Sequence, residues 1–249
     1  MAERLAFVTG GGRGIGASVA RALAADGFSV VVGARTREEV DVVADEIGGR
    51  AVELDVSSPS SIANVLASVG PVDLLVNNAG IGGPSSSFVD ESADDWWRVF
   101  EVNVRGPYLC CRAVVPGMLE RGGGRIVNVA SGAAYLPSGG GGGSTAYGPS
   151  KAALHRFSET LAGQLAPQNV FVFSISPGLV RTSMTDHFGD DAPWTPPECA
   201  PTLVRKLATG DYDTLAGRYL HAEHDDVDDL LARLDDIREK DLNAIRLRR

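Results

Sequence analysis

Short apolar runs alternate along the chain with longer segments of helical character. These intervening segments are long enough to form crossover helices, so the pattern predicts a parallel sheet with helices on both faces. We therefore expect one α/β domain over residues 1–249, built on a doubly wound sheet of about seven parallel strands. The predicted strands are Leu5–Thr9, Ser29–Val32, Ala51–Leu54, Val72–Asn77, Arg125–Ala130, Val170–Ser174 and Arg218–His221.

Three stretches depart from this alternation. Gly139–Gly143 is a run of glycines, and because ordering polyglycine carries a large entropy cost, it predicts a mobile loop. Residues 184–201 are rich in proline and aspartate. Residues 225–249 predict one more helix, a helical tail with an acidic start and a basic end that suit the helix dipole. Its apolar residues follow helical spacing: Val227, Leu230, Leu231, Leu234 and Ile237.

The composition narrows the class of protein. The 249 residues suffice for one substantial core, and a formal net charge of −9 disfavours nucleic acid and anionic membranes as partners. No apolar run is long enough to span a bilayer and residues 1–4 lead into a strand, so we expect no signal peptide, no anchor and a cytoplasmic location. The three cysteines form no C-x-x-C pair and the four histidines show no metal spacing, so we expect free thiols and no metal site.

A glycine-rich turn follows the first predicted strand and precedes a run of helix formers, Ala17–Ala25. Such a turn forms a diphosphate cradle, because glycines admit close backbone approach and the helix N-terminus offers free N–H groups. Two fingerprint spacings fit, one starting at Gly12 and one at Gly10, and we prefer the second because Gly10 stands at the strand end. Taken alone, the motif fits a flexible turn equally well. The candidate cradle residues are Gly10, Gly12, Arg13, Gly14, Ile15 and Gly16.

Tyr147 and Lys151 stand four residues apart at the predicted start of an amphipathic helix. Positions i and i+4 share one face of a helix, so the phenol and the ammonium can meet. A nearby cation lowers the pKa of a tyrosine from its usual value of about 10. The pair therefore predicts an acid/base group suited to interconverting a carbonyl and an alcohol.

Several motifs in order along the chain make it resemble the short-chain dehydrogenase/reductase family in its compact form. The resemblance runs from residue 5 to about residue 185 and weakens over the C-terminal residues. It implies a Rossmann-like fold and an oxidoreductase activity. The motifs that carry it are Thr9-Gly10-x-x-x-Gly14-Ile15-Gly16, Asn77-Asn78-Ala79-Gly80, Asn103, Ser131, Tyr147-x-x-x-Lys151 and Pro177-Gly178.

The resemblance assigns catalytic roles to four residues. Tyr147 is then the general acid in reduction and the base in oxidation. Lys151 lowers the pKa of Tyr147 and binds the nicotinamide ribose. Ser131 holds the substrate oxygen and stabilises the developing alkoxide. Asn103 holds a water molecule that links Lys151 to solvent.

Ser131 has two neighbouring alternatives, Ser138 and Ser144, and we prefer Ser131 because it directly follows the predicted strand. Ser131 and Tyr147 are 16 residues apart, slightly more than is usual in the family. We expect the glycine run between them to hold the surplus as a bulging loop, which leaves both catalytic ends in place.

Two arginines decide the expected cofactor. In dinucleotide folds an acidic residue at the end of the second strand holds the ribose 2′-OH of NAD. Ala34 stands at that position here, Arg35 follows it, and Arg13 is a second cation aimed at the same side. Guanidinium groups match phosphate bidentately, so we expect the 2′-phosphate of NADP(H). The alternative is that Arg35 is a solvated charge at a helix cap, and Glu38 and Glu39 add negative charge nearby.

The resemblance places further residues against the cofactor. Asp55 is expected to contact the adenine amino group, and Asn77 to lie beside the adenosine ribose, whereas Asn78 is expected to be architectural. Residues 184–201 take the place of the family's substrate-covering lid. The other implied cofactor-binding residues are Val56, Ala79, Gly80, Tyr147, Lys151, Pro177, Gly178 and Thr182.

Three functions remain open on the sequence. The leading one is an NADP(H)-dependent reductase or dehydrogenase acting on a ketone or secondary alcohol. A catalytically silent NADP(H)-binding sensor or scaffold is the second, and the retained Ser131, Tyr147 and Lys151 count against it. The third is a nucleotide-sugar epimerase, for which the chain leaves little beyond the sheet to form a sugar-binding domain.

We expect a small-molecule substrate and self-association. Following the family, a homodimer or homotetramer would pair through the helices around Trp96–Tyr108 and Ser150–Leu165. Apolar and aromatic residues suggest the wall of a substrate pocket, although a packed lid explains them equally well: Tyr135, Leu136, Met184, His187, Phe188 and Trp194.

Overall fold

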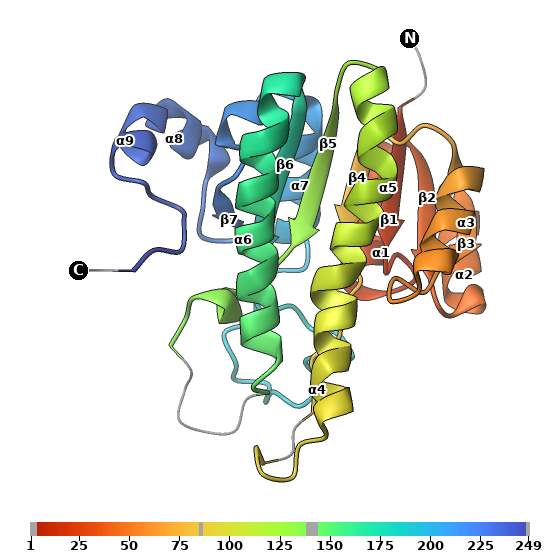
Figure 1. Ribbon diagram of the computed structural model, residues 1–249, viewed down its shortest axis with the longest axis vertical. Coiled ribbons are helices and arrows are strands. Elements are labelled where there is room, and N and C mark those ends of the chain that lie inside the picture. The colour runs from red at the N-terminus through yellow and green to blue at the C-terminus, as the bar shows by residue number, and fades with distance from the viewer. Residues whose placement is uncertain (1–3, 85–86, 138–143, 248–249) are drawn as a thin grey trace.

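The computed structural model describes residues 4–84, 87–137 and 144–247, which form one seven-stranded sheet (Figure 1). The strand order is β3-β2-β1-β4-β5-β6-β7, and every neighbouring pair is parallel. The predicted Rossmann-like sheet is therefore confirmed, with strand ends shifted by one or two residues. The strands are β1 (Leu5–Thr9), β2 (Ser29–Ala34), β3 (Arg50–Glu53), β4 (Leu74–Asn77), β5 (Gly124–Val129), β6 (Val170–Ser176) and β7 (Tyr219–His221).

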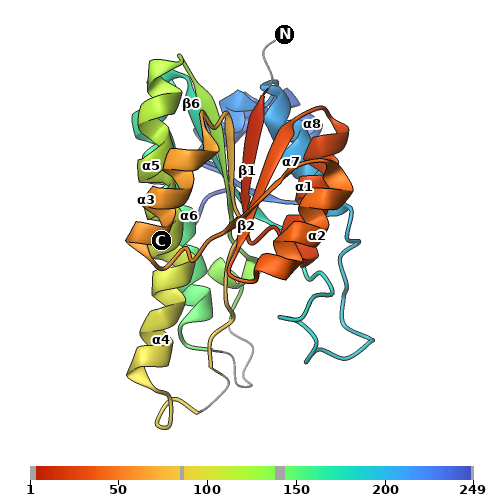
Figure 2. The same ribbon diagram turned by 90° about the vertical axis from the view of Figure 1, so that its right-hand side faces the viewer.

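Helices cover both faces of the sheet, as Figure 2 shows edge-on. Successive side chains of a strand point to opposite faces of the sheet, so the strands contribute apolar side chains to two separate layers. In β1, for example, Ala6 and Val8 join one layer and Phe7 joins the other. The first layer packs under α1 (Gly14–Ala25), α2 (Arg37–Ile47) and α7 (Cys199–Thr209), and the second under α3 (Pro59–Val69), α5 (Gly106–Glu120) and α6 (Tyr147–Leu165).

The helix α4 (Ala93–Phe100) continues directly into α5 through one π-helical turn, Glu101–Arg105. Such a turn inserts an extra residue into the helical ladder and is frequent at functional sites. Asn103 occupies the middle of this turn and is fully buried. The turn therefore aims a polar side chain inward from a helix that otherwise packs along the sheet.

Beyond β7 the sequence predicted one helix over residues 225–249, and that prediction is wrong. The chain forms two short helices, α8 (Val227–Ala232) and α9 (Leu234–Glu239), and continues without helix to residue 247. The helices are separated at Arg233, whose φ of −115° and ψ of 34° leave the helical region. This break lets apolar residues of both helices, including the fully buried Ile237, reach the same core.

After α9 the chain returns along the edge of the sheet. The Tyr219 N–H donates to the Asn243 carbonyl, and the Asn243 side-chain amide donates to the Tyr219 carbonyl. Arg246 then forms ion pairs with Glu159 of α6 and with Asp241. The tail thereby covers the exposed edge of β7, which would otherwise offer unpaired backbone groups.

Two sequence expectations, the loop Gly139–Gly143 and the alternative serine Ser138, lie outside the described residues. Within the described ranges, no helix is both long and apolar enough to cross a membrane. The same residues contain no cluster of three or more histidine, cysteine or acidic side chains placed to hold a metal. Cys110, Cys111 and Cys199, all in the described part, are free thiols.

Candidate active site

A cleft of about 630 Å³ opens at the carboxyl ends of the strands, where β1 has β2 on one side and β4 on the other. Ligands of doubly wound sheets bind at this kind of switch point. In Figure 1 these strand ends point to the lower part of the molecule. The sequence-predicted residues that line the cleft are Gly10, Gly12, Arg13, Gly14, Ile15, Arg35, Asp55, Val56, Ala79, Gly80, Tyr147, Lys151, Pro177 and Thr182.

The glycine turn after β1 has the close backbone contacts that a diphosphate cradle requires. Gly10 and Gly14 have φ values of +64° and +53°, which side chains rarely adopt. A Cβ on Gly16 would lie 2.2 Å from the Gly10 carbonyl oxygen, so α1 begins directly against the strand end. A Cβ on Gly14 would lie 3.2 Å from Thr182 across the cleft. These contacts fit an anionic group held against the backbone N–H groups of the turn and of α1.

The two asparagines at the end of β4 lie differently relative to the cleft. Asn77 is buried, and its side-chain amide donates to Asn128 and Cys111 inside the molecule. Asn78 lines the cleft, and its amide donates to the carbonyls of Thr9 and Gly10. Asn77 therefore does not face the cleft as expected, because the strand pleat turns it away. The hydrogen bonds of Asn78 to Thr9 and Gly10 fit the architectural role expected for it.

Charged side chains gather at the end of the cleft beside β2 and β3. Arg13 and Arg35 both line it and are exposed, as the NADP(H) hypothesis requires. Arg13 is not unpaired, however, because its guanidinium contacts Glu39 of α2 at 3.0 Å. Asp55 accepts hydrogen bonds from the backbone and hydroxyl of Ser57. Partial burial raises the pKa of Asp55, but these two hydrogen bonds together with the charges of Arg98 and Arg35 leave it below its usual value.

Ser131, Tyr147 and Lys151 come together from β5 and α6. Ser131 follows β5 and caps a short turn, and α6 begins at Tyr147 as the sequence predicted. The Ser131 hydroxyl lies close enough to the Tyr147 hydroxyl to lower its pKa, so the long connection between them does not separate the two. The Lys151 Nζ lies 5.8 Å from the centre of the Tyr147 ring.

The pKa of Tyr147 shifts in the direction opposite to the expectation. Burial raises the pKa of Tyr147, and the nearby Ser131 hydroxyl offsets this rise only in part. Lys151 is 4% exposed and burial lowers its pKa to about 8. Its ammonium donates instead to the Val129 carbonyl at 2.8 Å. In the free protein the lysine therefore does not offset the desolvation of the phenol, because its charge is itself destabilised by burial.

Asn103 is held by backbone and side-chain partners on both sides. Its Oδ1 accepts from the Ile81 N–H, and its Nδ2 donates to the Ile81 carbonyl and to the Ser150 hydroxyl. Gly80 separates it from the lysine, since a Cβ there would lie 3.2 Å from the Asn103 Oδ1 and 3.4 Å from the Lys151 Nζ. Asn103 is thus close behind Lys151, and its amide is fixed in one orientation.

The segment between β6 and α7 forms the remaining wall of the cleft. Pro177 and Thr182 line it as expected, whereas Gly178 packs away from it against Thr195. Sequence reasoning missed Arg181, which lines the cleft, pairs with Asp190 and lies 4.3 Å over the Trp194 ring. No motif marks this arginine, and only the fold of the segment brings it to the cleft.

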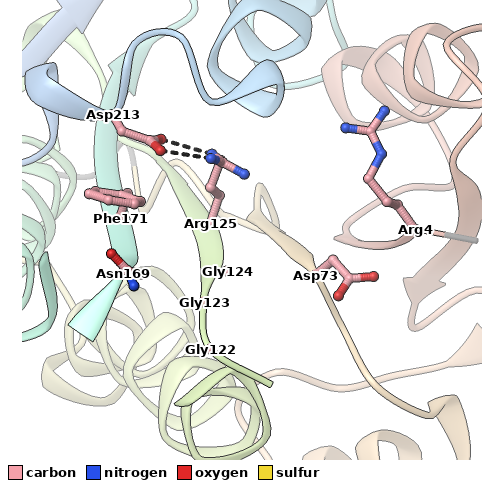
Figure 3. Close-up of a pocket in the computed structure, with 9 residues that line it drawn as sticks. All are labelled: Arg4, Asp73, Gly122, Gly123, Gly124, Arg125, Asn169, Phe171 and Asp213. Carbon is pink, nitrogen blue, oxygen red and sulfur yellow. Dashed lines mark hydrogen bonds and ion pairs between the residues drawn. The ribbon is translucent and has the colours of Figure 1, made fainter. Parts of the chain in front are cut away.

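A second cleft, of about 490 Å³, lies at the opposite, amino ends of the strands (Figure 3). A bidentate ion pair between Arg125 and Asp213 forms one side, and Arg4 and Asp73 form the other. It contains neither the glycine turn nor the acid/base residues, so the cleft at the carboxyl ends is the candidate active site.

Comparison with known proteins agrees with this geometry. The family model for short chain dehydrogenase matches residues 4–193. A short chain dehydrogenase of Pseudocercospora fijiensis (strain CIRAD86) is 43% identical over 194 residues, which is 73% of this chain and 61% of that protein. The chain thus spans less than two thirds of that relative's length. The short chain dehydrogenase mpl6 of Monascus purpureus is 34% identical over 263 residues, 98% of this chain and 88% of that protein.

Solved structures show the same fold. The NADP active-site complex of RhlG from Pseudomonas aeruginosa superposes with a TM-score of 0.80 at 29% identity. The match covers 89% of this chain and 95% of RhlG. That complex shows that a related chain of this fold holds NADP.

Proposed function

The chain belongs to the short-chain dehydrogenase/reductase family, and on that premise we propose that it is an NADP(H)-dependent oxidoreductase acting on a ketone or secondary alcohol. The observation that carries the proposal is the meeting of Ser131, Tyr147 and Lys151 beside the cleft that the glycine turn also lines. A phenol that lies beside a hydroxyl and a buried ammonium suits proton transfer to a carbonyl oxygen.

Each residue has a distinct part in this proposal. The bound dinucleotide supplies or accepts the hydride. Tyr147 gives its proton to the substrate oxygen in reduction and removes it in oxidation. Ser131 donates a hydrogen bond to the same oxygen. Lys151 stabilises the phenolate once the polar groups of a bound ligand lie beside its ammonium and offset the cost of burying that charge. Asn103 keeps the backbone behind Lys151 fixed through Ile81 and Ser150.

The choice of NADP(H) over NAD(H) rests on charge. Arg13 and Arg35 line the cleft beyond β2, and Ala34 stands where a carboxylate would hold a free 2′-hydroxyl. Thr36 occupies the N-cap position of α2 and lines this end of the cleft, but its side chain makes no hydrogen bond to the first N–H groups of the helix. The N–H groups of α2 are therefore oriented to support a phosphate beside the two guanidinium groups.

The proposal includes the setting of the enzyme. Exposed aromatic residues on α4 and α5, Trp97 and Tyr108, support self-association as a homodimer or homotetramer. Free thiols at Cys110 and Cys111 suit a reducing, cytoplasmic compartment.

Two assays test the proposal. Titration with NADPH and NADH, followed by nicotinamide fluorescence, should show tighter NADPH binding that Arg35→Asp abolishes. A panel of ketones and secondary alcohols should then show turnover with the preferred cofactor. Equal binding of both cofactors, unchanged in the variant, would refute the NADP(H) choice. Tight binding without turnover on any substrate would favour the silent sensor.

A further inference from the structure

The segment between β6 and α7, residues 177–198, is closed at its base by a reciprocal pair of hydrogen bonds. The Thr195 N–H donates to the Leu179 carbonyl at 2.9 Å, and the Leu179 N–H donates to the Thr195 Oγ1 at 3.1 Å. The chain between these two residues contains no helix or strand. Thr195 therefore joins the outgoing and returning arms of a long loop.

Thr195 is also tied to a distant part of the chain. Its side chain is buried, and its hydroxyl donates to the Glu223 Oε2 at 2.5 Å. Glu223 lies in the turn after β7, and its neighbour Ala222 donates its N–H to the Ser176 carbonyl at the end of β6. The loop base is thus connected to two strand ends of the sheet, through one hydroxyl that both donates and accepts.

The arm fixed by this contact is the one that forms the cleft wall. Gly178 has a φ of +80°, and a Cβ there would lie 2.1 Å from the Thr195 Oγ1, so the two residues are in direct contact. Five residues on this arm line the cleft: Pro177, Arg181, Thr182, Ser183 and Met184. A shift of Thr195 therefore moves the wall, although Thr195 itself does not line the cleft.

We propose that Thr195 and Glu223 are positioning residues, a clamp that holds the wall of residues 177–184 ready for cofactor and substrate. The effect on binding rests on the proposed function, whereas the effect on the loop does not. Glu223 serves as the acceptor that orients the Thr195 hydroxyl, and that orientation leaves the oxygen lone pair free for the Leu179 N–H. The clamp lowers the entropy lost when ligand binds, because the loop base is already ordered.

Two variants remove the clamp and two conserve it. Thr195→Val keeps the shape but removes the hydroxyl, and Glu223→Ala removes the acceptor. Thr195→Ser keeps the hydroxyl, and Glu223→Gln keeps an acceptor oxygen. Thr202→Val, at an exposed threonine on α7, is the matched control.

The first readout is the KM for NADPH against kcat. Thr195→Val and Glu223→Ala should raise KM about ten-fold, the equivalent of one or two hydrogen bonds, with kcat changed less than about three-fold. The serine and glutamine variants should stay near wild type. An equal loss of kcat in all four variants, or a Thr202→Val that matches Thr195→Val, would overturn the proposal.

The second readout needs no activity. Chymotrypsin cleavage after the exposed Phe188 in ligand-free protein should become about five-fold faster in the two clamp-removing variants. Wild-type cleavage rates in both would overturn the clamp even if the variants altered KM. If wild-type protein neither binds NADPH nor turns over, the proposed function fails, and this readout still decides the clamp.

Discussion

Replacing Lys151 by methionine should stabilise the ligand-free protein while it removes the proposed activity. The Lys151 side chain is buried, and burial lowers its pKa from 10.5 to about 8. Its described hydrogen bond goes to a neutral carbonyl, that of Val129. At pH 7 the fold therefore carries a buried ammonium whose desolvation methionine would remove, while keeping the apolar stem.

The gain in stability on replacing Lys151 can be calculated from the shift in its pKa. At about 1.4 kcal/mol per pKa unit, a fall from 10.5 to about 8 corresponds to about 3 kcal/mol of destabilisation at pH 7. The Val129 carbonyl loses its donor in the variant, which costs about 1 kcal/mol. Lys151→Met should therefore be more stable than wild type by about 2 kcal/mol at pH 7.

The pH dependence of the stability difference shows whether the buried Lys151 ammonium is its cause. Below pH 8 the lysine is protonated in both folded and unfolded chains, so the full destabilisation is present. Between pH 8 and 10.5 the folded protein releases its proton first, the unfolded chain binds more protons, and wild-type stability rises. At pH 9.5 the advantage of the variant should have fallen to near zero.

Urea denaturation of both proteins at pH 7 and pH 9.5 measures this difference, because other titrating groups cancel between them. Lys240→Met, at an exposed lysine, should change stability by less than about 0.5 kcal/mol at either pH. A Lys151→Met variant less stable than wild type at pH 7, or a gap that is equal at both pH values, would refute the reasoning.

Three further predictions concern other parts of the molecule. His155 is fully buried, with no hydrogen-bond partner for either ring nitrogen among the described residues, and burial lowers its pKa. His155→Leu should raise the free energy of unfolding by about 2 kcal/mol at pH 7 and remove the contribution of this histidine to the loss of stability below about pH 6.5, both measured by urea denaturation. Glu39→Gln should free Arg13 from its exposed ion pair and tighten NADPH binding about two- to five-fold, with a smaller change for NADH in parallel titrations. Asp213→Asn should weaken the half-buried pair with Arg125 and destabilise the protein by about 2 kcal/mol without changing the dissociation constant for NADPH, because the pair lies at the far end of the sheet.

The sequence was sufficient for the sheet because most of its strands, such as β1, β2, β4 and β6, are buried on both faces and read as continuous apolar runs between helices. The start of α6 at Tyr147 and the glycine turn were equally predictable, because both are local motifs. The burial of Asn77 was not predictable, because adjacent strand-end residues point to opposite sides and nothing in the identities of Asn77 and Asn78 says which side faces the cleft.

Interactions between distant segments were beyond the sequence. Thr195 and Glu223 are 28 residues apart and belong to no motif, so their contact could not be predicted. The direction of the shift in the Tyr147 pKa depends on burial, which the spacing of Tyr147 and Lys151 does not reveal. The continuous helix expected over the tail failed because its apolar spacing persists across Arg233, where tertiary packing breaks the backbone helix. Periodicity thus located the apolar face of the tail and missed its bend.

The most direct test of the central claim is the kcat/KM of wild-type protein against Tyr147→Phe, with NADPH and a ketone that the wild type reduces. If Tyr147 is the general acid, the phenylalanine variant should lose at least about 10²-fold in kcat/KM while its NADPH dissociation constant stays within about two-fold. A variant that retains wild-type turnover would show that another group donates the proton and would contradict the proposed mechanism.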